Sequence, residues 1–326
     1  MLRPDAALDA PAPRAVTRLV PPRSALGEVL DAGALVLGQA GVADARREAR
    51  LLWATLTETT VTRMWLDPRA AVSADVLERF DDLVRRRVAG EPQAYVIGTA
   101  AFRTLHLAVT RDTLIPRPET EGLVEHVLRW GAERRAPRAE PLRGPGPRAH
   151  DYLPVALDIG TGTGCIALSL AVEGRFQCVV ATDISEAALA MAAANREAIA
   201  PAVPVEFRRG SLFAPIAPGE RFDVIVANPP YITDREYVEL DPSVRDWEPR
   251  VALVAGANGM HHVRALLAGA GARLVPGGLL AIEVDSRRAE RACAAARAGG
   301  WPDARIDVDL FGRPRYLLAT CTRAEP

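Results

Sequence analysis

Four consecutive residues, Asn-Pro-Pro-Tyr at positions 228–231, carry the clearest chemistry in this sequence. They follow an apolar run, residues 222–227, of the kind that forms a buried strand. Proline has no backbone N–H, so two prolines in succession end the strand and stiffen the chain that follows. The sequence therefore predicts a rigid corner that presents one amide, one backbone carbonyl and one aromatic ring.

A corner of this kind suits a planar NH₂ group. The lone pair of such a nitrogen is delocalised, so the group attacks a methyl carbon poorly. Two acceptors placed against its N–H bonds would orient the lone pair and stabilise the positive charge that develops on nitrogen. The Asn228 side-chain oxygen and the Pro229 carbonyl are the two acceptors, and the Tyr231 ring can pack on the planar group. Adenine N6, cytosine N4, guanine N2 and a glutamine side chain all fit.

A glycine loop predicts the other half of the site. An apolar strand, residues 155–159, leads into GTGTG at 160–164, and glycines allow the backbone to approach a ligand closely. Asp183 closes the next strand about 20 residues on, where an acid usually binds ribose hydroxyls. The dinucleotide pattern would need glycine where Cys165 stands. Asp158, before the loop, would attract the cationic amino group of S-adenosylmethionine, which we expect as the cofactor.

Strands alternate with helices after residue 151, which predicts an α/β fold with a mostly parallel, Rossmann-like sheet. Helices are expected after Gly164, from Ser185 and from Gly259. FGRPR, residues 311–315, should join a terminal antiparallel hairpin at one edge of the sheet. Ligands of such sheets bind outside the carboxyl ends of the strands, so the glycine loop and NPPY share one rim. The expected strands are 155–159, 178–182, 205–208, 222–227, 279–284, 305–310 and 316–321.

The region before the sheet divides into three parts. Residues 1–23 are rich in Ala, Pro and Arg and predict a disordered tail. Residues 24–98 predict a helical domain, with Asp44 and Ser73 as helix N-caps. The alternating pattern after Thr99 predicts a hairpin linker over residues 99–119. The methyltransferase domain should then span 120–323, with a helix over 120–130 and a flexible insertion at 135–151.

The composition of the chain argues against several classes of binding partner. The formal net charge is −1, so no basic footprint for nucleic acid is evident. The four cysteines form no CxxC pair and the histidines have no ligand spacing, so we expect no metal and a reduced, cytoplasmic compartment. No apolar run reaches the length of a membrane span. The expected protein is a monomer with neither a membrane nor a direct nucleic-acid partner.

Further motifs indicate a family. NPPY, LIPRPETE (114–121) and EPQAYVIG (91–98) together resemble the release factor glutamine N5-methyltransferases, the PrmC/HemK family. WEPRVAL, residues 247–253, is similar to a family stretch that follows the catalytic motif. The resemblance covers residues 24–321. It implies methyl transfer from S-adenosylmethionine to the glutamine of the Gly-Gly-Gln motif in class 1 peptide chain release factors, and through this a modulation of translation termination.

The resemblance also implies a set of site residues and a role for the helical domain in recognising the release factor. The implied catalytic residues are Asn228, Pro229 and Tyr231. The implied cofactor-binding residues are Asp158, Gly160, Thr161, Gly162, Thr163, Gly164, Asp183, Ser211, Leu212 and Asn228. The implied substrate-binding residues are Asn228, Pro229, Pro230, Tyr231, Pro116, Arg117 and Glu119.

This sequence departs from the family pattern at several positions. Ser211 stands where an acid is usual, so it can accept a hydrogen bond from an adenine amino group without charge. Leu212 offers apolar contact where some members have an aromatic residue. AGANGM (255–260) replaces a tighter glycine pair, EVD (283–285) replaces Glu-x-Gly, and the 135–151 insertion is atypical. These departures bear on cofactor affinity more than on the type of reaction.

Two alternatives remain open from the sequence. A nucleic-acid amino-methyltransferase would share NPPY and the glycine loop, but would more often carry a basic patch. A non-catalytic adaptor would use the helical domain to bind a translation factor, and its cofactor site would be vestigial. LIPRPETE argues against the first, because nucleic-acid amino-methyltransferases generally lack it.

Overall fold

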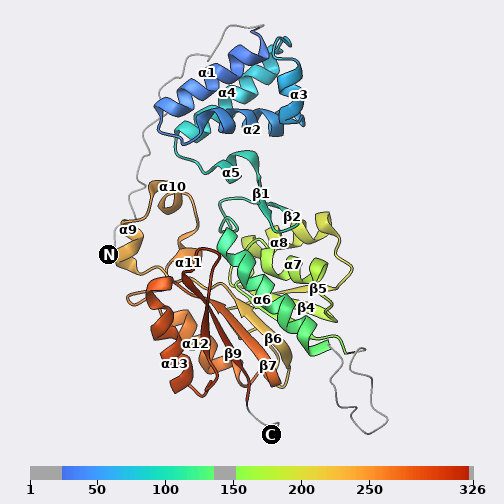
Figure 1. Ribbon diagram of the computed structural model, residues 1–326, viewed down its shortest axis with the longest axis vertical. Coiled ribbons are helices and arrows are strands. Elements are labelled where there is room, and N and C mark those ends of the chain that lie inside the picture. The colour runs from blue at the N-terminus through green and yellow to red at the C-terminus, as the bar shows by residue number, and fades with distance from the viewer. Residues whose placement is uncertain (1–23, 136–151, 323–326) are drawn as a thin grey trace, which may run out of the picture. The chain divides into compact units, whose positions relative to one another are not determined.

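The computed structural model describes residues 24–135 and 152–322, and Figure 1 shows the elements that they form. The expected tail and nearly all of the expected insertion lie outside the described residues. The chain divides into two compact units, one that ends at Ile97 and one that begins at Gly98. No helix among the described residues is long and apolar enough to cross a membrane.

The first unit is helical, as predicted. Its helices are α1 (Leu26–Gln39), α2 (Ala45–Thr57), α3 (Val61–Leu66), α4 (Ala74–Val88) and α5 (Gln93–Ile97). Leu37, Leu52 and Phe80 are fully buried between them. Ser73 caps α4 by accepting a hydrogen bond from the Val76 amide at 3.4 Å. The cap predicted at Asp44 is wrong, because this residue has φ +49° and its side chain accepts no capping hydrogen bond.

The second unit is built on a seven-stranded sheet with the order β5-β4-β3-β6-β7-β9-β8. The first five strands of that order are parallel, and β9 runs antiparallel to both β7 and β8. The predicted terminal hairpin is therefore confirmed. The strands are β3 (Val155–Ile159), β4 (Cys178–Asp183), β5 (Val205–Arg209), β6 (Phe222–Ala227), β7 (Leu274–Glu283), β8 (Arg305–Val308) and β9 (Pro314–Thr320).

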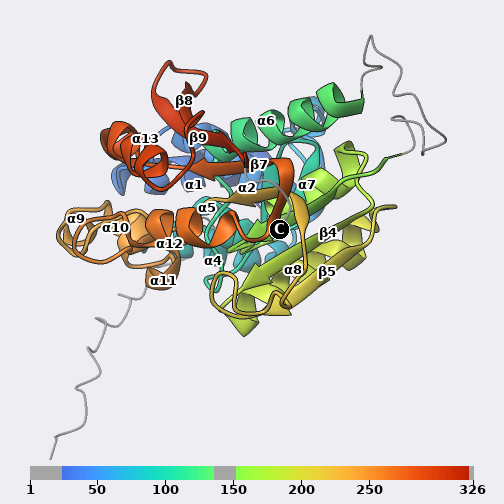
Figure 2. The ribbon, with the colours of Figure 1, turned by 90° about the horizontal axis from the view of Figure 1, so that it is seen from below.

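Helices cover both faces of this sheet, since neighbouring strand residues point to opposite sides. Leu157, Ile225 and Leu280 pack under α12 (His261–Ala270) and α13 (Ala289–Ala298). The opposite face packs under α6 (Pro118–Arg135), α7 (Cys165–Glu173) and the hairpin of β1 (Thr99–Phe102) and β2 (Leu105–Ala108). α8 (Glu186–Ile199) lies along β4 and β5. Figure 2 shows the two layers of helices on either side of the strands.

Strand order determines where a ligand can bind. The chain leaves β3 for β4 and β5 on one side, then crosses back so that β6 lies on the other side of β3. Such a switch point leaves a crevice at the carboxyl ends of the two central strands. The glycine loop follows β3 and NPPY follows β6, so both motifs border this crevice.

Some predicted boundaries need correction. α6 begins at Pro118 rather than Thr120, because the fixed φ of proline suits the first turn of a helix. β7 begins at Leu274 rather than Leu279. Sequence reasoning also missed three short helices that follow NPPY, because each is too short for helical periodicity to be recognised. They are α9 (Asp234–Val238), α10 (Pro242–Arg245) and α11 (Arg250–Leu253).

Candidate active site

The glycine loop presents bare backbone to a cavity. Gly160 and Gly162 have φ +76° and +55°, and no atom lies within 4 Å of a Cβ built on either. The amides of Gly160 and Thr161 donate to the Thr182 carbonyl at 2.8 and 3.0 Å, which fixes the loop against β4. A ligand could therefore lie directly against the loop, in space that a side chain would fill.

Asp158 lies beneath this loop and is fully buried. Its Oδ2 accepts hydrogen bonds from the Thr161 hydroxyl at 2.6 Å and the Ala167 amide at 3.2 Å, and Oδ1 has no partner among the described residues. Burial raises the pKa of Asp158 to about 7, although both hydrogen bonds oppose the rise. In the structure this carboxyl holds the loop to α7. Its predicted attraction for a ligand amino group stays a prediction.

Asp183, at the end of β4, both lines the cavity and organises the loop. Its Oδ2 accepts from the Gly162 amide and its Oδ1 from the Ser185 amide, each at 2.9 Å. Ser185 in turn caps α8. The carboxylate is therefore held at the point where the glycine loop meets the rim of the cavity.

The cavity extends from the glycine loop to the NPPY corner. It contains about 900 Å³ of empty volume, part of it open to solvent. Leu212 borders it with φ +49°, an uncommon conformation for a residue with a side chain of this size. The lining comprises Asp112, Thr113, Leu114, Ile159, Gly160, Gly162, Asp183, Ile184, Ser185, Ala188, Gly210, Ser211, Leu212, Asn228, Pro229, Pro230, Pro249, Val251, Ala252 and His262.

A second cavity lies on the other side of the corner. Leu114, Asn228, Pro229 and Ala252 line both cavities, so Asn228 and Pro229 are part of the wall between them. Tyr231 and Arg117 line only the second, which contains about 590 Å³ of empty volume. Burial raises the pKa of Tyr231 to about 12, so its hydroxyl stays protonated at neutral pH. Two ligands, one in each cavity, would meet at Asn228.

LIPRPETE is anchored beside this corner by WEPRVAL. Glu248 is buried and accepts from the Ile115 amide at 3.2 Å and from Arg117 at 2.5 Å. Arg111 stacks over the Trp247 ring at 3.8 Å. The two motifs that supported the family resemblance, far apart in sequence, thus contact each other at the site.

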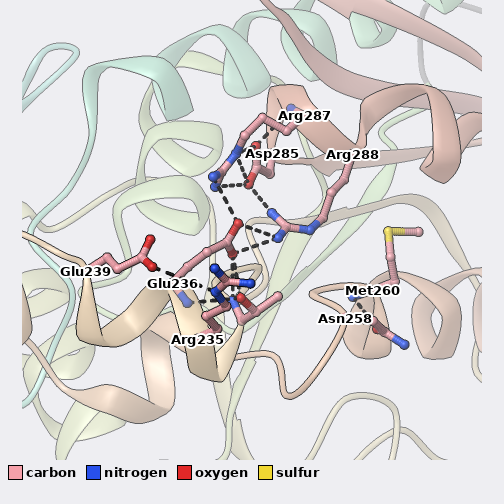
Figure 3. Close-up of polar contacts among 9 residues, drawn as sticks. Arg235, Glu236, Glu239, Asn258, Met260, Asp285, Arg287 and Arg288 are labelled. Atoms are coloured by element: carbon pink, nitrogen blue, oxygen red, sulfur yellow. Dashed lines mark hydrogen bonds and ion pairs between the residues drawn. The ribbon is translucent and has the colours of Figure 1, made fainter.

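A charged network fixes the segment behind the corner (Figure 3). Glu236 forms a capping box with Thr233 and accepts from Arg288 at 2.7 Å. Arg288 also pairs with Asp285, the residue that replaces glycine in the family pattern. Burial alone would raise the pKa of Glu236, but the Thr233 amide and Arg288 lower it to about 2. The network therefore remains ionised at neutral pH and ties α9 to the end of β7.

Gly259 is packed tightly against the same segment. A Cβ at this position would come within 2.6 Å of both the Tyr231 carbonyl and the Arg288 Nε. Gly256, three residues earlier, has a similar φ, +72° against +67°, but a Cβ placed on it would meet nothing within 4 Å. Alanine at either position would meet the same unfavourable backbone conformation, but only at Gly259 would it also meet a steric clash.

Gly259→Ala should therefore destabilise the fold more than Gly256→Ala. The left-handed backbone alone costs an alanine about 1–2 kcal/mol, and the crowding at Gly259 should add about 1–3 kcal/mol. Urea denaturation of both variants measures the difference in the free energy of unfolding. Equal losses in the two variants would show that Tyr231 is not held by this contact.

The sequence matches known families over both units. The PrmC N-terminal domain matches residues 28–98, and the methyltransferase small domain matches residues 151–240. A release factor glutamine methyltransferase of Cereibacter sphaeroides is 38% identical, over 87% of this chain and 94% of the relative. The protein of the same name from Moorella thermoacetica is 37% identical, over 91% of this chain and 97% of the relative. The chain belongs to the release factor glutamine methyltransferase family.

The fold agrees with this membership. The solved structure of the hMettl16 catalytic domain in complex with MAT2A 3'UTR hairpin 1 matches with a TM-score of 0.50 and 15% identity. The match covers 78% of this chain and 84% of that chain and shows a likeness of fold alone. The expected class, a Rossmann-like class I S-adenosylmethionine-dependent methyltransferase fold after a helical region, is confirmed.

The methyltransferase brings most of the predicted site residues to its two cavities. Six predicted site residues line neither cavity: Asp158, Thr161, Thr163, Gly164, Pro116 and Glu119. The Glu119 side chain instead pairs with Arg313 at 3.1 Å. The predicted residues at the cavities are Gly160, Gly162, Asp183, Ser211, Leu212, Asn228, Pro229, Pro230, Tyr231 and Arg117.

Several lining residues of this methyltransferase escaped sequence reasoning. His262 was given no role in the site, yet it borders the cavity at the glycine loop. Burial and the neighbouring His261 lower its pKa, so it is neutral at physiological pH. Asp112 and Thr113, which immediately precede LIPRPETE, line the same cavity together with Leu114, the first residue of that motif. Their position before or at the start of that motif is the only signal in the sequence that could have indicated them.

Proposed function

We propose that this protein transfers a methyl group from S-adenosylmethionine to a glutamine side chain of a release factor, that of the Gly-Gly-Gln motif in class 1 factors. The observation that supports the proposal is the position of Asn228 and Pro229 in the wall between two cavities. One cavity has the backbone cradle and the carboxylate that suit the methyl donor. The other has the acceptors and the ring that suit a planar amide. Relatives that share nearly the whole chain carry the corresponding name.

The residues present fit the methyl donor. The open backbone at Gly160 and Gly162 would hold its amino-acid portion, and the Asp183 carboxylate would accept hydrogen bonds from the ribose. Ser211 and Leu212 would contact the adenine. When bound, S-adenosylmethionine supplies an electrophilic methyl group next to the corner.

The corner would prepare the glutamine nitrogen for attack. The Asn228 Oδ1 and the Pro229 carbonyl each accept one N–H of the substrate amide, which turns its lone pair toward the methyl carbon. The N–C bond forms as the S–C bond breaks, and the two acceptors stabilise the positive charge that develops on nitrogen. The proton leaves afterwards to water, so no strong base is required. Tyr231 packs on the amide plane.

The first unit is proposed to bind the body of the release factor, because the PrmC N-terminal domain matches it. The second unit supplies both cavities. A substrate that acts in translation would place the enzyme in the cytoplasm.

Methyl incorporation into a purified class 1 release factor tests the proposal. Labelled S-adenosylmethionine should transfer one methyl group to each wild-type factor and none to a factor whose Gly-Gly-Gln glutamine is alanine. DNA and ribosomal RNA substrates, incubated in parallel, should remain unlabelled. Labelling of a nucleic acid, or equal labelling of the two release factors, would overturn the proposed substrate.

A further inference from the structure

The Asn228 amide has two ends of nearly equal size and opposite chemistry. Its Oδ1 can accept a substrate N–H, whereas its Nδ2 can only donate. If the amide turned over, it would present NH₂ to the substrate NH₂ and could not accept. The chemistry proposed above therefore requires something that fixes the orientation of this side chain.

Thr120 faces the nitrogen end of the amide. Its Oγ1 accepts a hydrogen bond from the Asn228 Nδ2 at 2.9 Å, and the residue is almost wholly buried, at 2% exposure. Thr120 lies in the first turn of α6, within LIPRPETE but outside both cavities. It therefore acts on Asn228 from behind, where no substrate can reach.

Glu283 determines which way the Thr120 hydroxyl points. The Thr120 hydroxyl lowers the pKa of the Glu283 carboxyl against the effect of burial, so it acts toward the ionised carboxylate as a donor. A hydroxyl has one proton, and once this is given to Glu283 its oxygen can only accept from Asn228. Only the nitrogen end of the amide can satisfy it.

Sheet register brings these groups together. Ala227 of β6 pairs with Ile282 of β7, so Asn228 and Glu283 follow at adjacent strand ends. Glu283 is 1% exposed, and its Oε2 has no hydrogen-bond partner among the described residues. A buried carboxylate with an unsatisfied oxygen is costly, which argues for a role beyond packing.

We propose that Thr120 and Glu283 are positioning residues that lock the Asn228 amide with its Oδ1 toward the substrate. Glu283 orients the hydroxyl, the hydroxyl selects the nitrogen of the amide, and the oxygen is left facing the cavities. This inference rests on the proposed function for its catalytic consequence, but the orientation itself belongs to the protein without substrate.

Thr120→Val and Thr120→Ser form a matched pair for testing the lock. Valine keeps the shape of threonine without the hydroxyl, and serine keeps the hydroxyl. Thr120→Val should lower kcat by about 5- to 10-fold, the value of one net hydrogen bond, with KM for the release factor and Kd for S-adenosylmethionine within about twofold of wild type. Thr120→Ser should keep wild-type kcat. A valine variant as fast as wild type, or a serine variant as slow as valine, would overturn the lock.

Nuclear magnetic resonance tests the orientation without any substrate. The Asn228 side-chain NH₂ signals are assigned by their loss in Asn228→Asp. In wild type and in Thr120→Ser they should show slow exchange with water, and in Thr120→Val fast exchange. Equal exchange in all three proteins would overturn the inference. If this test succeeds while wild type labels no release factor, the proposed function fails and the lock stands.

The lock should also depend on pH through Glu283. Burial raises the pKa of Glu283 to about 7, against the opposing effects of Thr120 and Arg315. A protonated Glu283 carboxyl can donate a hydrogen bond to the Thr120 hydroxyl. The hydroxyl can then donate to the Asn228 side-chain oxygen, which reverses the direction of both hydrogen bonds. The titratable groups that interact electrostatically with Glu283 are Arg117, Glu119, Cys165, Tyr231, Arg315 and Tyr316.

Wild-type kcat should therefore rise with pH through about 7 and then level off, because the ionised form is the active one. Glu283→Gln removes the titration and should give a flat profile over the same range. The profiles are measured at saturating concentrations of both substrates. An identical inflection in the two proteins would assign the pH dependence to another group and contradict the role of Glu283.

Discussion

Replacing Asn228 with alanine should lower kcat for methyl transfer by about 10²–10³-fold, the usual effect of removing one preorganised group that stabilises charge in the transition state. In the proposed mechanism the Asn228 Oδ1 is one of the two acceptors for the substrate N–H bonds, and Pro229 cannot replace it. The cradle at Gly160 and Gly162 is untouched, so Kd for S-adenosylmethionine should change by less than about tenfold. Single-turnover kinetics and calorimetry measure the two quantities separately.

Asn258→Ala is the matched control for this loss. Asn258 also carries an amide near the site, but within residues 24–135 and 152–322 its side chain bonds only to the Met260 backbone amide, and it lines neither cavity. Replacement of Asn258 should leave kcat within about twofold of the wild-type value, because substitutions away from the site and the core usually have small effects. An Asn228→Ala enzyme that retained a third of wild-type kcat would show that the corner does not orient the nucleophile.

Asp183→Ala should have the second largest effect, on cofactor binding rather than on the chemical step. The change removes a carboxylate from the cavity and leaves the amides of Gly162 and Ser185 without their acceptors. Hydrogen bonds to a charged group are each worth about 1.5–3 kcal/mol, so Kd for S-adenosylmethionine should rise by about 10- to 100-fold. Titration calorimetry of the purified variant measures this directly.

Asp183→Asn is the graded control. An asparagine keeps one oxygen and can satisfy only one of the two amides, so its Kd should fall between those of wild type and alanine. At saturating S-adenosylmethionine both variants should recover most of kcat. Unchanged affinity in Asp183→Ala would mean that the cavity at the glycine loop binds something other than the methyl donor.

Local signals in the sequence predicted the elements that present the site. The strands at 155–159 and 222–227 are confirmed with the same bounds, because each is an apolar run that ends in Gly or in Asn-Pro. Glycine spacing and the acid at Asp183 predicted a ligand-binding loop, and NPPY predicted a rigid corner; both line the cavity at the glycine loop. In each case the functional side chains lie within a few residues of the turn that presents them.

Contacts between distant segments were beyond sequence reasoning. Thr120 was interpreted only as a helix start and Glu283 only as part of a departure from a family pattern. Sheet register and the docking of α6 bring both to Asn228, and neither can be read from nearby residues. His262 and residues 112–114 reach the cavity at the glycine loop for the same reason. Asp44 failed as a cap because its backbone is left-handed, which a residue type alone does not reveal.

The most direct test of this account is the fragmentation mass spectrum of the Gly-Gly-Gln tryptic peptide of a class 1 release factor, after incubation with this protein and S-adenosylmethionine. The account predicts a gain of one methyl mass, located on the glutamine side chain. An unmodified glutamine, in a reaction where calorimetry shows that the methyl donor is bound, would contradict it.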